Sequence, residues 1–88
     1  MDHRIIIHNT DMNKEMQTRA IHVASYALDQ FQQPIDVAGY IKQYFDRTFY
    51  PAWHCIVGKQ FGSCFSYQIE SFINFSFLDD SVLLYKLG

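Results

Sequence analysis

The sequence contains few of the residues that mark disulfide-rich, metal-binding or redox proteins. Its only two cysteines, Cys55 and Cys64, form neither a Cys-x-x-Cys pair nor a zinc-finger spacing with histidine. We therefore expect both to be free thiols in a reducing compartment, and we expect no metal and no cofactor. The four histidines are also spaced too irregularly to suggest a shared metal site.

Neither sign of charge dominates, and long apolar runs are missing. Seven basic and nine acidic residues are spread singly along the chain and give a net charge of −2. The sequence therefore has no basic stripe that could bind the phosphates of a nucleic acid. The run Ile5–Ile7 is too short for the apolar region of a signal peptide, and no run reaches membrane-spanning length. We expect a soluble cytoplasmic protein with no nucleic-acid partner and no membrane partner.

Apolar and aromatic side chains are abundant, at 49% and 17% of 88 residues. A chain of this length forms one domain, taken as residues 1–88. So small a domain buries only about 60–65% of its unfolded surface, so it is marginally stable alone and gains from oligomerising. Part of the apolar surface is therefore expected at an interface.

The first half of the chain predicts one strand and two helices. Arg4–His8 is a β-branched run, and Asp11 or Asn13 can cap the helix that follows it. Pro34 suits the first turn of the second helix, where Asp36 faces the positive end of the dipole. The apolar stripe of the first helix is Met16, Ala20, Val23, Ala24, Ala27, Leu28 and Phe31. That of the second helix is Val37, Ala38, Ile41, Phe45 and Phe49.

In the second half of the chain, the spacing of apolar residues changes from a helical period to the alternation of a strand. Strands are predicted at Trp53–Gly58, Ser63–Gln68, Ser71–Leu78 and Ser81–Lys86, with a tight turn at Asp79-Asp80. The third of these strands alternates, which places Ile73, Phe75 and Phe77 on a core face and Phe72, Asn74 and Ser76 on a partly wet face. The element order is β-α-α-β-β-β-β. This order predicts an α+β domain with two helices on one side of an antiparallel sheet.

No arrangement of residues points to catalysis. The pair His54-Cys55 invites a cysteine-nucleophile interpretation, but neighbouring strand residues point to opposite faces and cannot share a proton. Cys64 lacks a glycine-rich oxyanion loop and a third orienting residue, and Asp79-Asp80 fits a solvated turn. We predict no catalytic residues and no enzyme activity. For His54 two interpretations stay open: a neutral imidazole with its hydrogen bonds made, or a pH sensor at an interface.

The most informative stretch is Trp-His-Cys-Ile-Val-Gly at 53–58, followed two residues later by Phe-Gly-Ser at 61–63. This run resembles the signature of the eight-kilodalton dynein light chain family. Nearly the whole chain is similar to that family without a gap. Further matching residues are Asn9-Thr10-Asp11-Met12, Ile41-Lys42, Phe45-Asp46, Leu83-Leu84 and Lys86.

The resemblance implies a homodimer in which two protomers exchange a strand. The segment that follows Phe61-Gly62-Ser63 would pair with the 53–58 strand of the other subunit, and His54 would lie at the two-fold interface. Each of two grooves would then take an extended partner peptide by β-strand addition. The implied interface residues are Trp53, His54, Cys55, Val57, Cys64 and Ser66. The implied groove residues are Phe61, Gly62, Ser63, Cys64, Phe65, Ser66, Tyr67, Phe72, Asn74, Ser76, Pro34 and Ile35.

Departures from the family pattern fall on the groove. Pro34-Ile35 stands where the family usually has Glu-Lys, and proline has no N–H to offer a peptide. Cys64-Phe65-Ser66-Tyr67 replaces Tyr-Val-Thr-His, and the 72, 74 and 76 positions lack two usual tyrosines, which predicts a wider and more polar pocket. Leu87 replaces a serine proposed as a phosphorylation switch, so that switch is predicted to be absent.

The resemblance implies a non-catalytic light-chain subunit of a dynein motor that clamps disordered segments, such as those of a dynein intermediate chain, and promotes their dimerisation. The resemblance also implies that the protein is localised to the cytoplasm and the cytoskeleton. The altered groove suggests a member dedicated to one motor, for which an axonemal dynein arm is one setting. Two alternatives stay open: a motor-independent hub for many disordered proteins, and a structural motor subunit that binds little beyond intermediate chains.

Overall fold

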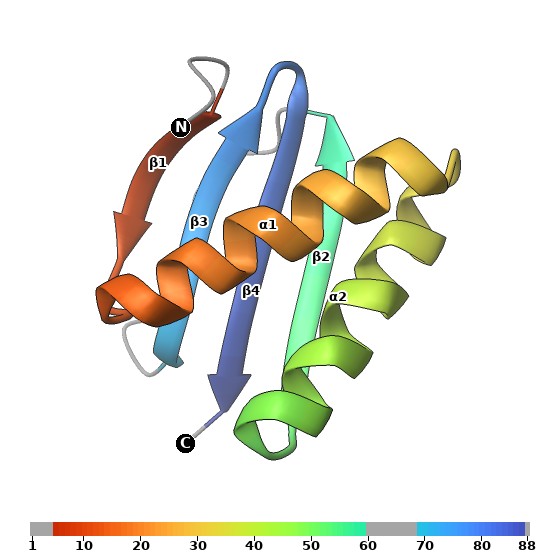
Figure 1. The fold of residues 1–88 in the computed structure, drawn as a ribbon. Coiled ribbons are helices and arrows are strands. Elements are labelled where there is room, and N and C mark those ends of the chain that lie inside the picture. Colours follow the sequence, from red (N-terminus) through yellow and green to blue (C-terminus); the bar gives the residue numbers. More distant parts are fainter. Residues whose placement is uncertain (1–4, 60–68, 88) are drawn as a thin grey trace.

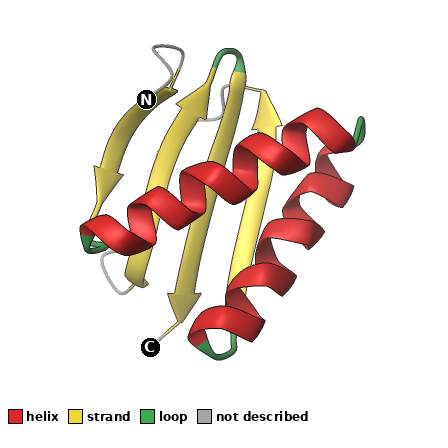
Figure 2. Cartoon of the chain, viewed as in Figure 1, coloured by secondary structure: helices red, strands yellow, loops and turns green. Residues whose placement is uncertain are grey.

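The structure, a computed structural model, describes residues 5–59 and 69–87 (Figure 1). Its elements are β1 (Ile5–Thr10), α1 (Lys14–Gln30), α2 (Pro34–Phe49), β2 (Trp53–Lys59), β3 (Ile69–Phe77) and β4 (Asp80–Leu87). Both helices lie on one face of the sheet, and α1 crosses the strands diagonally (Figures 1 and 2). The α+β prediction is confirmed. The strand expected at 63–68 lies outside the described residues.

The described strands form one antiparallel sheet in the order β1-β3-β4-β2. β3 and β4 are joined by a hairpin whose turn residues are Leu78 and Asp79, so the prediction of a turn at Asp79-Asp80 is wrong by one residue. Asp80 belongs to β4 because it pairs with Phe77 on one side and with Lys59 on the other. Its carboxylate also lies 3.0 Å from the Lys59 ammonium.

Helix α1 begins at the second of the two predicted caps. The Asn13 side-chain oxygen accepts a hydrogen bond from the Met16 N–H at 2.9 Å, as expected at an N-cap. The inward stripe is mostly as predicted, with Ala20, Val23, Ala24, Ala27 and the unpredicted Ile21 buried. Phe31 was expected in this core and is instead 37% exposed. It follows the last helical residue, and its ring packs on Tyr40 with the centroids 5.7 Å apart.

The core lies between the helices and the sheet. Val37, Ile41 and Phe45 of α2 are buried, and the Phe45 ring meets Trp53 edge-on with the centroids 4.9 Å apart. Burying each such side chain contributes about 1.5–3 kcal/mol. The Trp53 indole N–H finds no acceptor within 5–59 and 69–87, so its described contribution is apolar packing. The sheet supplies Ile73, Phe75, Val82 and Leu84 to this core.

The Asp11 carboxylate joins the end of β1 to the start of β3. Its two oxygens accept hydrogen bonds from the backbone N–H groups of Phe72 at 2.7 Å and Ser71 at 3.0 Å. The Thr10 hydroxyl donates to the Phe72 carbonyl at 2.7 Å. Ser71 lies at a bulge with φ of 51°. Asp11 therefore satisfies two amides beside a strained residue and fixes where β3 enters the sheet.

Replacing Asp11 should weaken the fold. Asp11→Ala is expected to lower the free energy of unfolding by about 1–3 kcal/mol, because two backbone amides lose a charged acceptor. Urea denaturation at one fixed protein concentration measures this change. The matched control is Asp29→Ala, which removes an exposed carboxylate and should change stability by less than about 0.5 kcal/mol. Equal losses in both variants would contradict the role given to Asp11.

The Asp46 carboxylate links α2 to the start of β2. One oxygen accepts from the Trp53 backbone N–H at 2.8 Å, and the other accepts from the Lys42 ammonium one helical turn earlier. The Lys42 hydrogen bond, followed by the Trp53 N–H, lowers the pKa of Asp46 below its ordinary value. The ionised carboxylate is therefore the form that the folded state favours.

The lowered pKa makes a pH-dependent contribution to stability. It is present above the unfolded pKa of about 3.9 and is lost as the pH falls through the folded pKa. Asp46→Asn is expected to reduce the free energy of unfolding by about 1 kcal/mol at pH 7, and the difference should shrink below about pH 4. Asp36→Asn, on the same helix, should show a smaller difference. A loss that stays constant from pH 7 to pH 3 would refute this linkage.

Candidate functional site

Strand β2 lies at an edge of the described sheet. It pairs with β4 in unbroken register from Trp53 opposite Lys86 to Lys59 opposite Asp80. No strand among residues 5–59 and 69–87 lies on its other side. Within the described part of the chain, the backbone groups of β2 that point away from β4 therefore have no strand partner, and a further strand could pair with them. Helix α2 flanks β2 along its length in Figure 1.

The side chains of β2 divide between the two faces of the sheet. Trp53, Cys55 and Val57 pack against the helix-covered core, and Trp53 is 1% exposed. His54 and Ile56 point to the opposite face, as the alternation of a strand requires. Burial raises the pKa of the Cys55 thiol to about 12, so this thiol stays protonated at neutral pH and is a poor nucleophile or metal ligand.

The face of the sheet that the helices leave uncovered is called the open face below. Its described residues include Ile6, His8, Asn9, His54, Ile56, Phe72, Asn74, Ser76, Ser81, Leu83 and Tyr85. The His54 ring stacks on Tyr85, with the centroids 5.3 Å apart and the planes at 21°. Ile6 and Ile56 are 58% and 48% exposed, which leaves apolar surface at both edges of this face.

Phe72, Asn74 and Ser76, which were predicted to form the partly wet face of their strand, lie on the open face together with His54. Phe72 lies opposite Tyr85, which in turn lies opposite His54, so these rings form one row across three strands. Ser76 Oγ lies 2.7 Å from His8 Nε2. Asn74 is only 3% exposed, so the expectation that this side of the strand is wet does not hold at its centre. The structure thus splits the predicted interface set: His54 is on the open face, whereas Trp53, Cys55 and Val57 are not.

The start of α2 has few free backbone donors. The N–H groups of Asp36 and Val37 both donate to the Gln33 carbonyl, at 3.0 and 3.2 Å, and Pro34 has no N–H. The Ile35 N–H makes no hydrogen bond within the described part of the chain, and its side chain is 80% exposed. This helix end therefore offers one unpaired amide beside an exposed apolar side chain.

Seven predicted groove residues lie outside the described part of the structure. They are Phe61, Gly62, Ser63, Cys64, Phe65, Ser66 and Tyr67, two of which were also predicted at the dimer interface. The sequence analysis did not assign Ile56, Leu83 or Tyr85 to the interface or the groove. Their signal was the alternation within 53–58 and 81–86, which puts these residues on the same side as His54 once the pairing of β2 with β4 is known.

The described ranges offer neither a metal-ligand cluster nor a membrane-spanning helix. No three His, Cys, Asp or Glu side chains within 5–59 and 69–87 are placed to hold a metal ion together. Neither described helix has the length and apolar character needed to cross a membrane. The edge of β2, the open face and the start of α2 are therefore the features on which a functional argument rests.

Comparison with known proteins agrees with this architecture. The family model for dynein light chain type 1 matches residues 4–87. A dynein light chain of Schistosoma mansoni is 44% identical over 87 residues, covering 99% of this chain and 98% of that protein. Among solved structures, the dynein light chain-like domain of the Fasciola hepatica calcium binding protein FhCaBP2 covers 100% of this chain and 96% of that one, with a TM-score of 0.83 at 19% identity.

The dynein light chain-like domain of CsTAL3 has a TM-score of 0.82 at 16% identity, covering 98% of this chain and 95% of that one. At such identities the two solved structures support the fold alone. The family model and the Schistosoma relative also match in sequence along almost the full length of the chain. The resemblance seen in the sequence is therefore confirmed, and this chain belongs to the dynein light chain family.

Proposed function

We propose that this protein is a non-catalytic light-chain subunit of a dynein motor complex that clamps extended, disordered peptide segments as a homodimer. The observation that carries the proposal is the edge position of β2, whose outer side has no described strand neighbour. An exposed edge strand is a template for pairing with another chain. Its flank of exposed apolar side chains gives a second chain surface to bury.

In the proposed dimer, the segment after Phe61 of one protomer pairs with β2 of its partner. Cys64 and Ser66 would lie on that exchanged strand, and His54 would face the partner from the open face. The row of His54, Tyr85 and Phe72 and the exposed Ile56 support this arrangement, because a stable contact needs an apolar centre. Trp53, Cys55 and Val57 would contribute through the β2 backbone, since their side chains fill the core.

The peptide groove would lie between the exchanged strand and the start of α2. A partner peptide would extend the sheet, with Phe61 to Tyr67 of the exchanged strand, the Phe72, Asn74 and Ser76 positions, and Pro34 and Ile35 forming its walls. With one segment from each of two chains held in parallel, later contacts between those chains become intramolecular and can tighten by about 10²–10⁴-fold. The proposed ligands are disordered segments such as those of a dynein intermediate chain.

The altered start of α2 favours a retuned groove over a general one. The first turn of this helix offers the Ile35 N–H but no donor at Pro34. A peptide acceptor that needs the missing donor would be left unpaired, which weakens binding by about tenfold or more. We infer a subunit dedicated to one motor in the cytoplasm or cytoskeleton, with an axonemal dynein arm as one such setting. The alternative is a motor-independent hub.

The test is calorimetric titration with a peptide that carries a Thr-Gln-Thr core, at neutral pH and a concentration at which the protein sediments as a dimer. We expect one peptide per protomer and binding about tenfold tighter to Pro34→Ala than to the unchanged protein, because alanine restores one N–H. Equal, micromolar binding to both would favour the general hub. No heat from either protein, with the dimer intact, would overturn clamping of this ligand.

His54 is proposed to lie at the dimer interface, where a charged side chain should weaken the dimer. A lysine at the centre of an apolar interface is unfavourable, so His54→Lys should sediment as a monomer where the unchanged protein is a dimer. His22→Lys places the same charge on the exposed side of α1 and should leave the dimer intact.

Protonation of His54 should act like the lysine substitution. The unchanged dimer is expected to weaken as the pH falls from 7.5 to 5.5, because a charged imidazole is unfavourable at an apolar interface. Sedimentation that shows the same dimer from pH 7.5 to 5.5 would exclude this pH sensitivity.

A further inference from the structure

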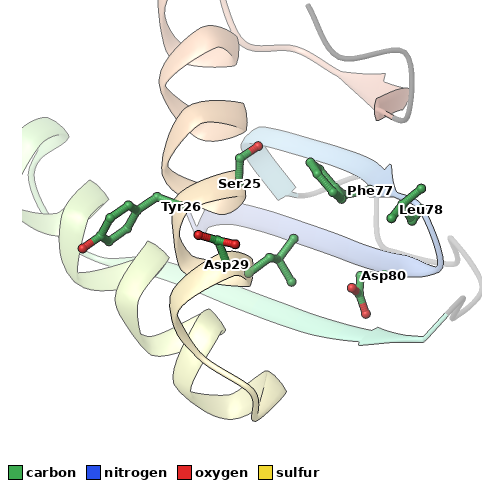
Figure 3. Close-up of a pocket in the computed structure, with 7 residues that line it drawn as sticks. Ser25, Tyr26, Asp29, Phe77, Leu78 and Asp80 are labelled. Carbon is green, nitrogen blue, oxygen red and sulfur yellow. The ribbon is translucent and has the colours of Figure 1, made fainter.

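A groove separates the second half of α1 from the β3–β4 hairpin on the helix-covered side of the sheet. The cavity has a volume of about 550 Å³ and is lined by Ser25, Tyr26, Leu28, Asp29, Phe77, Leu78 and Asp80. Figure 3 shows Ser25 and Asp29 projecting from α1 and Phe77, Leu78 and Asp80 from the hairpin across the gap. A second cavity of about 360 Å³ shares Leu28, Asp29 and Asp80 and extends to Pro34.

Leu78 is an unusual residue for its position in this groove. It occupies the hairpin turn with φ of 56°, a left-handed conformation that glycine or asparagine adopts more readily than leucine. Its side chain is also 56% exposed. The sequence thus places a branched apolar side chain in solvent at a position where its backbone is strained. Such local conflicts are expected where a residue serves binding rather than folding.

The charge around the groove is negative. Asp29 makes no ion pair within the described residues, Asp79 lies in the turn, and Asp80 contacts the exposed Lys59 at 3.0 Å. Helix α1 also ends here, and its last turn carries no basic residue to offset the negative end of the helix dipole. An approaching cation would therefore be attracted by the carboxylates and by the helix end together.

We propose that this groove is a second docking surface, which takes a partner segment carrying a lysine or arginine beside an apolar side chain. The apolar side chain packs on Leu78 and Phe77, and the cation lies near Asp29 and Asp80. The site lies on the helix-covered side of the sheet, opposite the open face, so it can be filled while the open face is engaged. It does not depend on peptide clamping at the edge of β2.

The probe is an array of ten-residue peptides in which leucine or phenylalanine is flanked by arginine or lysine, with glutamate replacing the cation in matched copies. The full-length protein is applied to the array, and the strongest peptide is titrated by NMR. We expect binding of the basic peptides, with shifts centred on the amides of Ser25, Asp29, Leu78 and Asp80. No binding, equal binding of the acidic copies, or shifts confined to β2 would overturn the proposal.

Two variants separate binding from folding. Leu78→Asn should raise the melting temperature, because asparagine tolerates the left-handed turn, while weakening the peptide by about tenfold or more. Asp29→Asn should weaken it several-fold at low salt and less at high salt. The control is Tyr50→Asn, which replaces a large side chain that is 79% exposed and lies away from the groove. Unchanged binding by Leu78→Asn, or an equal loss in Tyr50→Asn, would refute the assignment.

Discussion

The way in which α2 is joined to β2 decides which side chains of β2 face the core and which face outward. Asp46 holds the Trp53 N–H, and Phe45 packs on the Trp53 ring, so the first residue of β2 is fixed with its side chain inward. Because side chains alternate along a strand, this one constraint places Cys55 and Val57 in the core and His54 and Ile56 on the open face. A slip of one residue would exchange the two sets.

Within the described sheet, β2 is also an edge strand. With its inner side paired to β4 and α2 packed alongside, β2 presents its outer backbone groups next to the start of that helix. Two features formed by different residues thus meet at one place within residues 5–59 and 69–87. They are the outer backbone groups of β2, which have no described strand neighbour, and the Ile35 N–H, which makes no described hydrogen bond. The fold supplies the first and is shared within the dynein light chain family. Pro34 alters the second, which is where ligand preference is expected to change.

Sequence patterns predicted the local elements better than the contacts between them. The helical stripes and the alternation in 71–78 identified most inward side chains, because these periods reflect burial directly. They placed Phe31 in the core because it continues the stripe of α1, although the helix ends one residue earlier. The turn was assigned to Asp79-Asp80 on composition, and the strained leucine in the actual turn could not be anticipated from turn preferences.

Contacts distant in sequence were the least predictable part of the candidate site. The bonds from Asp11 to Ser71 and Phe72 join residues about sixty positions apart, and no local pattern reports them. The division of β2 between core and open face was predicted as an alternation, but which set lies inward follows only from the packing of Trp53. The family resemblance indicated groove and interface positions, and it did so without separating side chains that face a partner from those that fill the core.

We propose that the outer edge of β2 receives the segment after Phe61 from a second copy of this chain. Isotope-filtered NMR on a dimer mixed from differently labelled protomers tests it most directly. We expect nuclear Overhauser contacts between the amides of β2 in one protomer and residues 63–67 of the other. Contacts from β2 to that segment only within the same protomer, in a sample that sediments as a dimer, would contradict it.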